Sequence, residues 1–92
     1  MLATVKIENG FDHFLKIKKQ KLVPLFGEAG IRYIQVMSNF EETKIFMIFE
    51  NKHPDKMMEF IERDEVTEAR LEAGVKIETQ EMLSDLKRVW TP

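Results

Sequence analysis

Two neighbouring stretches in the middle of the chain, residues 31–38 and 44–50, have the pattern of β-strands that are apolar on both faces. In the first stretch, alternation places Ile34 and Val36 on one face of the strand. It places Ile31, Tyr33 and Met37 on the other. In the second stretch, Ile45, Met47 and Phe49 share one face, and Phe46 and Ile48 share the other. A sheet with one solvated face alternates apolar and polar residues, so these strands require cover on both sides.

The segments around these strands predict an α+β fold. Residues 2–8 and 75–83 have the alternation of strands, and residues 11–29 and 54–73 have the three- and four-residue spacing of helices. The resulting order, β-α-β-β-α-β, predicts one ferredoxin-like domain over residues 1–92. Its four-stranded antiparallel sheet carries two main helices on one face. The sequence leaves residues 80–92 open as strand or helix, with residues 84–92 a tail.

Proline and glycine mark the expected ends and breaks of the helices. Pro24 predicts a kink or a restart within the first helix, Pro54 suits the first turn of the second, and Asp64 can cap a restarted turn within the second. Gly30 and Gly74 each follow a helical pattern, where the backbone commonly needs a positive φ.

Composition limits what this chain can be. It has 92 residues and no cysteine, which excludes disulfides, thiolate metal sites and thiol nucleophiles and fits a reducing compartment. The formal charge of −2 argues against a nucleic-acid partner. No apolar run approaches the ~18–20 residues of a membrane span, and the first residues do not resemble a signal peptide. We therefore expect a cytoplasmic protein without membrane or nucleic-acid partners.

The second apolar face of the sheet predicts a homodimer. Left bare, its large side chains would expose on the order of 500 Å², about the largest patch that a monomer tolerates. At ~25 cal/mol per Å², this represents roughly 12 kcal/mol of unrealised burial as an upper bound. A two-fold copy that offers the same face is the commonest cover. The alternative is that the C-terminal segment with Trp90 folds over its own sheet.

The two helix exits carry a resemblance to a known family. The sequence Glu28-Ala29-Gly30-Ile31 precedes the second strand, Glu72-Ala73-Gly74-Val75 precedes the fourth, and Ile48-Phe49-Glu50 ends the third. This spacing, over roughly residues 2–83, resembles the dimeric α/β-barrel superfamily and is most similar to small uncharacterised bacterial relatives of the antibiotic biosynthesis monooxygenases. The resemblance implies two sheets packed face to face across a dimer, and a ligand site between each sheet and its helices.

Few side chains stand out as candidates for chemistry. His13 has the pKa range of a general base, and Tyr33 has a hydroxyl to offer a pocket. A boundary histidine and a packed tyrosine are the alternative interpretations. Side chains suited to an adaptable ligand pocket are Phe14, Met47, Phe60 and Trp90. His13 and His53 lack partner ligands at a metal-binding spacing, so we expect no metal and no cofactor. The lysines at 16, 18, 19 and 21 indicate a solvent-facing helix side.

Three functions remain open. The first is a homodimeric module that, without catalysis, binds a small hydrophobic or aromatic molecule or serves as an interaction module. The second, by analogy with the superfamily, is a cofactor-independent monooxygenase- or cyclase-like enzyme acting on a small aromatic or hydrophobic substrate. The third is RNA binding through an exposed sheet, which requires a monomer.

Overall fold

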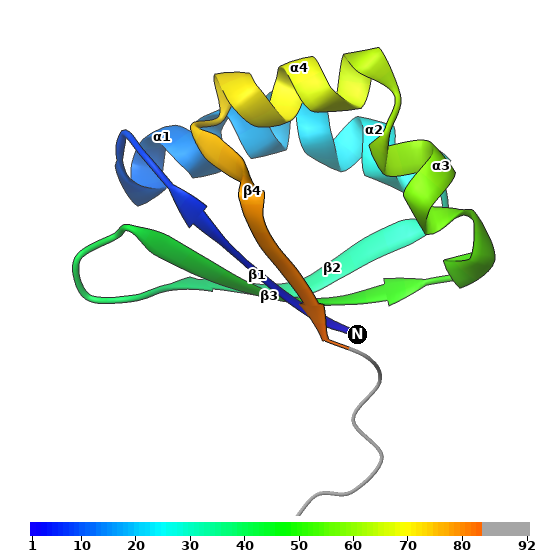
Figure 1. The fold of residues 1–92 in the computed structure, drawn as a ribbon, viewed down its shortest axis with the longest axis horizontal. Helices are drawn as coiled ribbons and strands as arrows, with labels where there is room; N and C mark the ends of the chain where they lie inside the picture. The colour runs from blue at the N-terminus through cyan, green and yellow to red at the C-terminus, as the bar shows by residue number, and fades with distance from the viewer. Residues whose placement is uncertain (84–92) are drawn as a thin grey trace, which may run out of the picture.

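The sheet of this protein is four-stranded and antiparallel, with the strand order β2-β3-β1-β4 (Figure 1). The computed structural model describes residues 1–83. Its elements in chain order are β1 (Leu2–Ile7), α1 (Gly10–Ile17), the π-helical turn η1 (Lys18–Leu22), α2 (Val23–Glu28), β2 (Ile31–Ser38), β3 (Lys44–Asn51), the 3-10 turn η2 (Pro54–Lys56), α3 (Met57–Ile61), α4 (Asp64–Glu72) and β4 (Val75–Leu83). The α+β class and the antiparallel four-stranded sheet expected from the sequence are confirmed.

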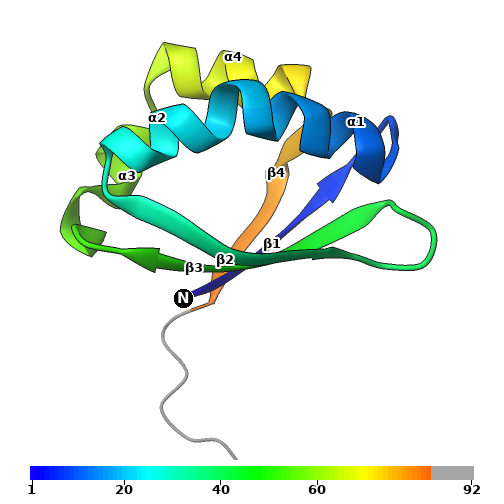
Figure 2. The same cartoon turned by 180° about the vertical axis from the view of Figure 1, so that it is seen from behind.

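The helices all cover the same face of the sheet, as Figures 1 and 2 show from opposite sides. The continuous run of α1, η1 and α2 lies beside α4 above the strands. The opposite face carries no element formed by residues 1–83. No helix in that part of the chain has the length and apolar character needed to cross a membrane.

The first helical segment runs from residue 10 to residue 28 without a gap. Pro24 lies in the first turn of α2, and the turn that leads into it is π-helical. Proline has no N–H to donate to the carbonyl four residues earlier, and a wider turn accommodates that loss. The helix begins where the Glu42 carboxylate accepts a hydrogen bond from the Phe11 backbone N–H at 2.9 Å. The carboxylate satisfies one of the free donors of the first turn.

The second helical segment, expected over residues 54–73 with a turn restarted at Asp64, is divided into separate helices. The 3-10 turn η2 leads into α3, and α4 starts anew at Asp64 after Arg63 adopts an extended backbone with ψ 139°. Asp64 and Glu65 then occupy the first turn of α4, where acidic side chains are favourable. The charged sequence 62–65 thus starts a new helix rather than continuing the old one.

A β-bulge in β2 corrects the predicted faces of that strand. Tyr33 pairs with Phe49 of β3, but Gln35 pairs with Ile48, so that Ile34 is an extra residue. The bulge reverses the alternation that follows. Val36 consequently packs against the core, and Met37 lies on the uncovered face, so the sequence-based assignment of both was wrong. No pattern of apolar residues marks the bulge.

The uncovered face nevertheless carries apolar residues in two rows of paired residues, each of which also contains polar ones. One row joins Ile48 of β3 to Leu2 of β1 and Leu83 of β4, with Gln35 of β2 paired to Ile48. The next joins Phe46 to Met37 and Thr4, with Glu81 of β4 paired to Thr4. Ile34, Met37 and Leu83 are 55%, 36% and 43% exposed. A third row is basic: Lys6 pairs with both Lys44 and Lys76.

The core lies between the sheet and the helices. Its fully buried members include Val5 and Ile45 from the sheet and Phe14 and Val66 from the helices. The loop that enters β4 closes against the sheet, because the Gly74 carbonyl accepts a hydrogen bond from the Glu8 N–H at 2.8 Å. Gly74 has φ +85°, and a Cβ on it would meet the Glu8 carbonyl oxygen at 2.2 Å. Only glycine fits there, in line with the helix-ending role expected for it.

Candidate functional site

Lys18 is buried in the core, with only 3% of its surface exposed. The sequence interpretation placed it with the solvent-facing lysines, which was wrong for this one residue. Its ammonium nitrogen Nζ lies 3.1 Å from the centre of the Tyr33 ring. The rings of Phe14 and Phe26 lie 5.4 Å and 5.9 Å from the same atom. Lys18 therefore points into an aromatic cage between the first helix and β2.

The helix geometry explains why this lysine faces inward. Phe14, Lys18 and Leu22 follow one another at four-residue steps, and all three are buried. Lys18 also opens the π-helical turn η1. Such turns are rare and occur frequently at functional sites. The exposed lysines 16, 19 and 21 lie on the remaining sides of the same helix.

A second cation, Arg70, enters the same region from α4 and is 6% exposed. Its guanidinium donates a hydrogen bond to the side-chain oxygen of Gln80 on β4. Gln80 lies at a widened part of β4, where residues 77–80 lie opposite Val5 alone. The side chain of Thr79 bridges the gap by accepting a hydrogen bond from the Lys6 N–H at 2.9 Å. This widened part of β4 is a bulge that interrupts the pairing between β1 and β4 at Gln80, the residue that accepts the hydrogen bond from Arg70.

A cavity of about 30 Å³ lies between these groups. This volume admits one or two water molecules. The polar side chains at its wall are Lys18, Tyr33, Arg70 and Gln80, and the rest of the wall is apolar. Among the described residues, no carboxylate lines it. Three methionines do line it, Met47, Met57 and Met82, and their unbranched side chains repack easily.

Burial and charge shift the acidity of all three ionisable groups at this cavity. Burial, and to a smaller extent the positive charge of Arg70, lower the pKa of Lys18 to about 7. Burial also lowers the pKa of Arg70. The pKa of the Tyr33 hydroxyl is raised by burial, against the opposing effect of Arg70. In all three groups, burial removes water from around the charged form and so disfavours it. No carboxylate among the described residues lines the cavity to offset this loss for the two cations.

The hydrogen-bonding capacity of the cavity wall is largely unused. Among residues 1–83, Nζ of Lys18 has only the Met47 sulfur as a hydrogen-bond acceptor, at 3.9 Å, and sulfur is a weak acceptor. The Tyr33 hydroxyl makes no hydrogen bond with the described part of the chain. Its ring packs at 5.5 Å from the Phe26 ring and 6.1 Å from the Phe49 ring, centre to centre. These groups are held in place by packing, and their polar ends remain available.

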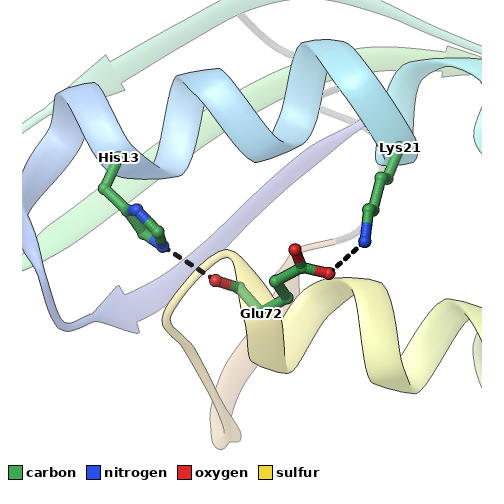
Figure 3. A network of polar contacts seen from close by, with 3 residues as sticks. All are labelled: His13, Lys21 and Glu72. Atoms are coloured by element: carbon green, nitrogen blue, oxygen red, sulfur yellow. Dashed lines mark hydrogen bonds and ion pairs between the residues drawn. The ribbon is translucent and has the colours of Figure 1, made fainter.

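His13 lies away from this cavity, in a polar network between α1 and α4 (Figure 3). Its Nε2–H donates to the backbone carbonyl of Glu72 at 2.8 Å. The Glu72 carboxylate in turn pairs with Lys21. The imidazole thus satisfies one of the free carbonyls at the end of α4 and ties the two helices together. His13 does not line the cavity.

The other candidate residues from the sequence lie in different parts of the structure. Phe14, Tyr33 and Met47 meet at the cavity. Phe60 packs edge-on against Phe26 at 4.9 Å and lines a separate open groove of about 330 Å³ that also includes His53. Trp90 lies outside the described residues. Among residues 1–83, no three His, Asp or Glu side chains cluster as metal ligands would.

Sequence reasoning missed the two cations of the site. Lys18 carried a signal, since it shares the four-residue spacing of Phe14 and Leu22. Arg70 carried a weaker signal: it lies four residues after Val66 and three before Ala73, but it sits among charged residues such as Glu68 and Glu72.

Comparison with known proteins gives no match: no protein-family model, no curated protein and no solved structure corresponds to this chain.

Proposed function

We propose that this protein is a homodimer that binds a small, largely apolar molecule between its sheet and its helices, without catalysis. The observation that carries the proposal is the burial of Lys18 and Arg70 at an apolar cavity without any acidic partner. Such an arrangement costs stability, and an apolar residue at either position would fold better. Perturbed buried charges beside a cavity are characteristic of binding and active sites.

The cavity wall supports a ligand larger than the present volume. Pockets for organic molecules usually measure some 300 Å³ or more, about ten times the space seen here. Met82 is 38% exposed and forms part of the wall, so it is placed to move outward. Met47 and the long stem of Lys18 can adopt other rotamers as a ligand enters.

The uncovered sheet face supports the homodimer. Ile34, Met37 and Leu83 leave large apolar surfaces exposed there, next to Phe46 and Ile48. A second copy would bury these rows, and the lysine row at the end of the face would form a polar rim. The strand order β2-β3-β1-β4 with helices on one face supports the ferredoxin-like arrangement, and hence membership of the dimeric α/β-barrel superfamily. The lack of cysteine supports a cytoplasmic location.

Protein-observed NMR tests the binding proposal. Small apolar molecules, for example benzyl alcohol and indole, are titrated into the ¹⁵N-labelled protein. Shift changes are expected to cluster at cavity-wall residues such as Val5, Phe14 and Ile45. Changes confined to the outer groove near His53, or no change at any probe, would contradict the proposed site.

The second candidate is a cofactor-independent monooxygenase- or cyclase-like enzyme for a small aromatic substrate. The unbonded hydroxyl of Tyr33 beside the amine of Lys18 favours it, because together they offer a proton donor and an acceptor at the cavity. Oxygen uptake with 1,4-dihydroxynaphthalene, lost in Tyr33→Phe and retained in His13→Gln, would support this function. No uptake above that of buffer would exclude this substrate.

A further inference from the structure

We infer that the molecule bound at this cavity carries an acidic group, of the carboxylate type, which lies between Lys18 and Arg70. This inference rests on the proposed function and specifies the ligand class. It also assigns the two cations a role, since nothing else in the described part of the chain uses their charge.

The charge balance of the cavity is the first argument. Two cations from different elements, η1 and α4, are 97% and 94% buried and face one apolar space. Buried cations are normally paired with an acid. The described ion pairs lie at the surface and involve other cations: Lys21 with Glu72, Arg32 with Glu50, and Arg63 with Glu65. No residue among 1–83 therefore supplies a negative charge to the cavity.

The free donors are the second argument. Lys18 carries three N–H donors and has no oxygen acceptor among the described residues, only the Met47 sulfur and aromatic faces. Arg70 carries five donors, and among the described residues it donates a hydrogen bond to Gln80 alone. A carboxylate has two oxygens and about four acceptor positions, enough to engage both side chains. The Tyr33 hydroxyl adds a third donor.

The remaining wall indicates what the acid is attached to. It is formed by aliphatic, aromatic and methionine side chains, among them Val5, Ile45 and Met82. Polar groups beyond the head group would lose their water there without compensation. The class that fits is a small monocarboxylic acid with an aromatic or short aliphatic body.

Calorimetry with matched probes tests the inference. Benzoate and benzyl alcohol have the same ring, and only benzoate is charged. We expect benzoate to bind at least tenfold more tightly than benzyl alcohol. At about pH 8 the Lys18 amine is mostly neutral, so an anion beside it is expected to draw a proton onto the complex. That uptake appears as a binding heat that differs between Tris and phosphate buffers. Tyr33 and Arg70 are the other ionisable groups at the cavity.

Variants at Lys18 and Arg70 test whether these two side chains bind the acidic group. Lys18→Met keeps the length of the side chain, and it is expected to weaken benzoate binding at least tenfold, to abolish proton uptake and to change benzyl alcohol binding much less than benzoate binding. Lys19→Met, on the exposed side of the same helix, should match the wild type in every measurement. Arg70→Gln provides a second variant, with weaker benzoate binding expected.

The outcomes separate this inference from the proposed function. Equal affinity for benzoate and benzyl alcohol, or benzoate binding that Lys18→Met does not change, overturns the acidic ligand and leaves a neutral binding site in place. If neither benzoate nor benzyl alcohol binds, both the acidic ligand and the proposed binding function are overturned.

Discussion

The ammonium nitrogen of Lys18 lies 3.1 Å from the centre of the Tyr33 ring, over its face. A desolvated cation gains about 2 kcal/mol from such a contact. The loss of water around a buried ion costs several kcal/mol. The ring therefore offsets only part of the cost of burying Lys18, and the positive charge of Arg70 increases that cost. The core of this small protein thus contains a group that reduces its stability.

Replacement of Lys18 by methionine should stabilise the free protein. The substitution removes the buried charge and keeps a flexible apolar side chain in the cage. We expect the free energy of unfolding at about pH 6 to rise by roughly 1–4 kcal/mol, the range seen when uncompensated buried charges are replaced. Urea unfolding followed by circular dichroism measures it. A loss of stability would show that the packing of the Lys18 side chain contributes more than the burial of its charge costs. Lys19→Met is the neutral control.

The stability of the wild type should rise with pH between about 7 and 10. The pKa of Lys18 is about 7 in the folded protein and 10.5 when unperturbed, so in this window the unfolded chain holds a proton that the folded chain has lost. The free energy of unfolding then increases with pH by up to roughly 4–5 kcal/mol. Below pH 7 both states are protonated and this contribution is lost.

The methionine variant isolates that effect. In Lys18→Met the increase attributable to this group is absent, so the advantage of the variant at about pH 6 should shrink by about pH 9.5. Unfolding curves of both proteins at the two pH values give the comparison. A gap of constant size would contradict the shifted pKa.

Two glycines should respond in opposite directions to alanine. Gly74 has φ +85° and no room for a Cβ beside the Glu8 carbonyl, so Gly74→Ala should destabilise by roughly 2–4 kcal/mol. Gly27 lies in α2 with nothing within 4 Å of a new Cβ, and Gly27→Ala should stabilise by about 0.4–1 kcal/mol. Thermal unfolding of the pair measures both. Similar melting temperatures would contradict the tight approach of the two loops.

A charge on the uncovered sheet face should break the proposed dimer. Ile48 belongs to the apolar rows of that face, and Ile48→Lys would place an ammonium in the interface. Sedimentation velocity at micromolar concentration should show a dimer for the wild type and a monomer for this variant. Leu71→Lys, at an exposed leucine of α4, is the matched control and should remain dimeric. A monomeric wild type would contradict the homodimer.

Patterns in the sequence were sufficient to predict the class of the fold. Alternation in the strands, three- and four-residue spacing in the helices and the two helix-ending glycines depend on local chemistry that each segment carries itself. Both Gly30 and Gly74 have positive φ as expected. The face of Val36 and Met37 depended instead on one extra residue in β2, which only pairing with β3 reveals. The break at Arg63 likewise has no proline or glycine to mark it.

The site was less accessible from the sequence, because its members are distant in the chain. Phe14, Tyr33 and Met47 could be chosen as pocket residues for their bulk and flexibility. The cations could not, since a lysine or an arginine in a charged helix is usually solvated. Lys18 becomes a core residue through the turn η1, and Arg70 through the bulge that brings Gln80 opposite it. Both depend on tertiary contacts.

The pKa of Lys18 in the free protein is the most direct test of this account. It can be read from the ¹³Cε and ¹Hε shifts of lysine-labelled protein, with Lys18→Met identifying the signal. We predict a midpoint near 7 for this lysine. A midpoint near 10.5 for Lys18 would show that its charge is fully compensated or solvated, and would contradict a cavity that lacks a negative partner.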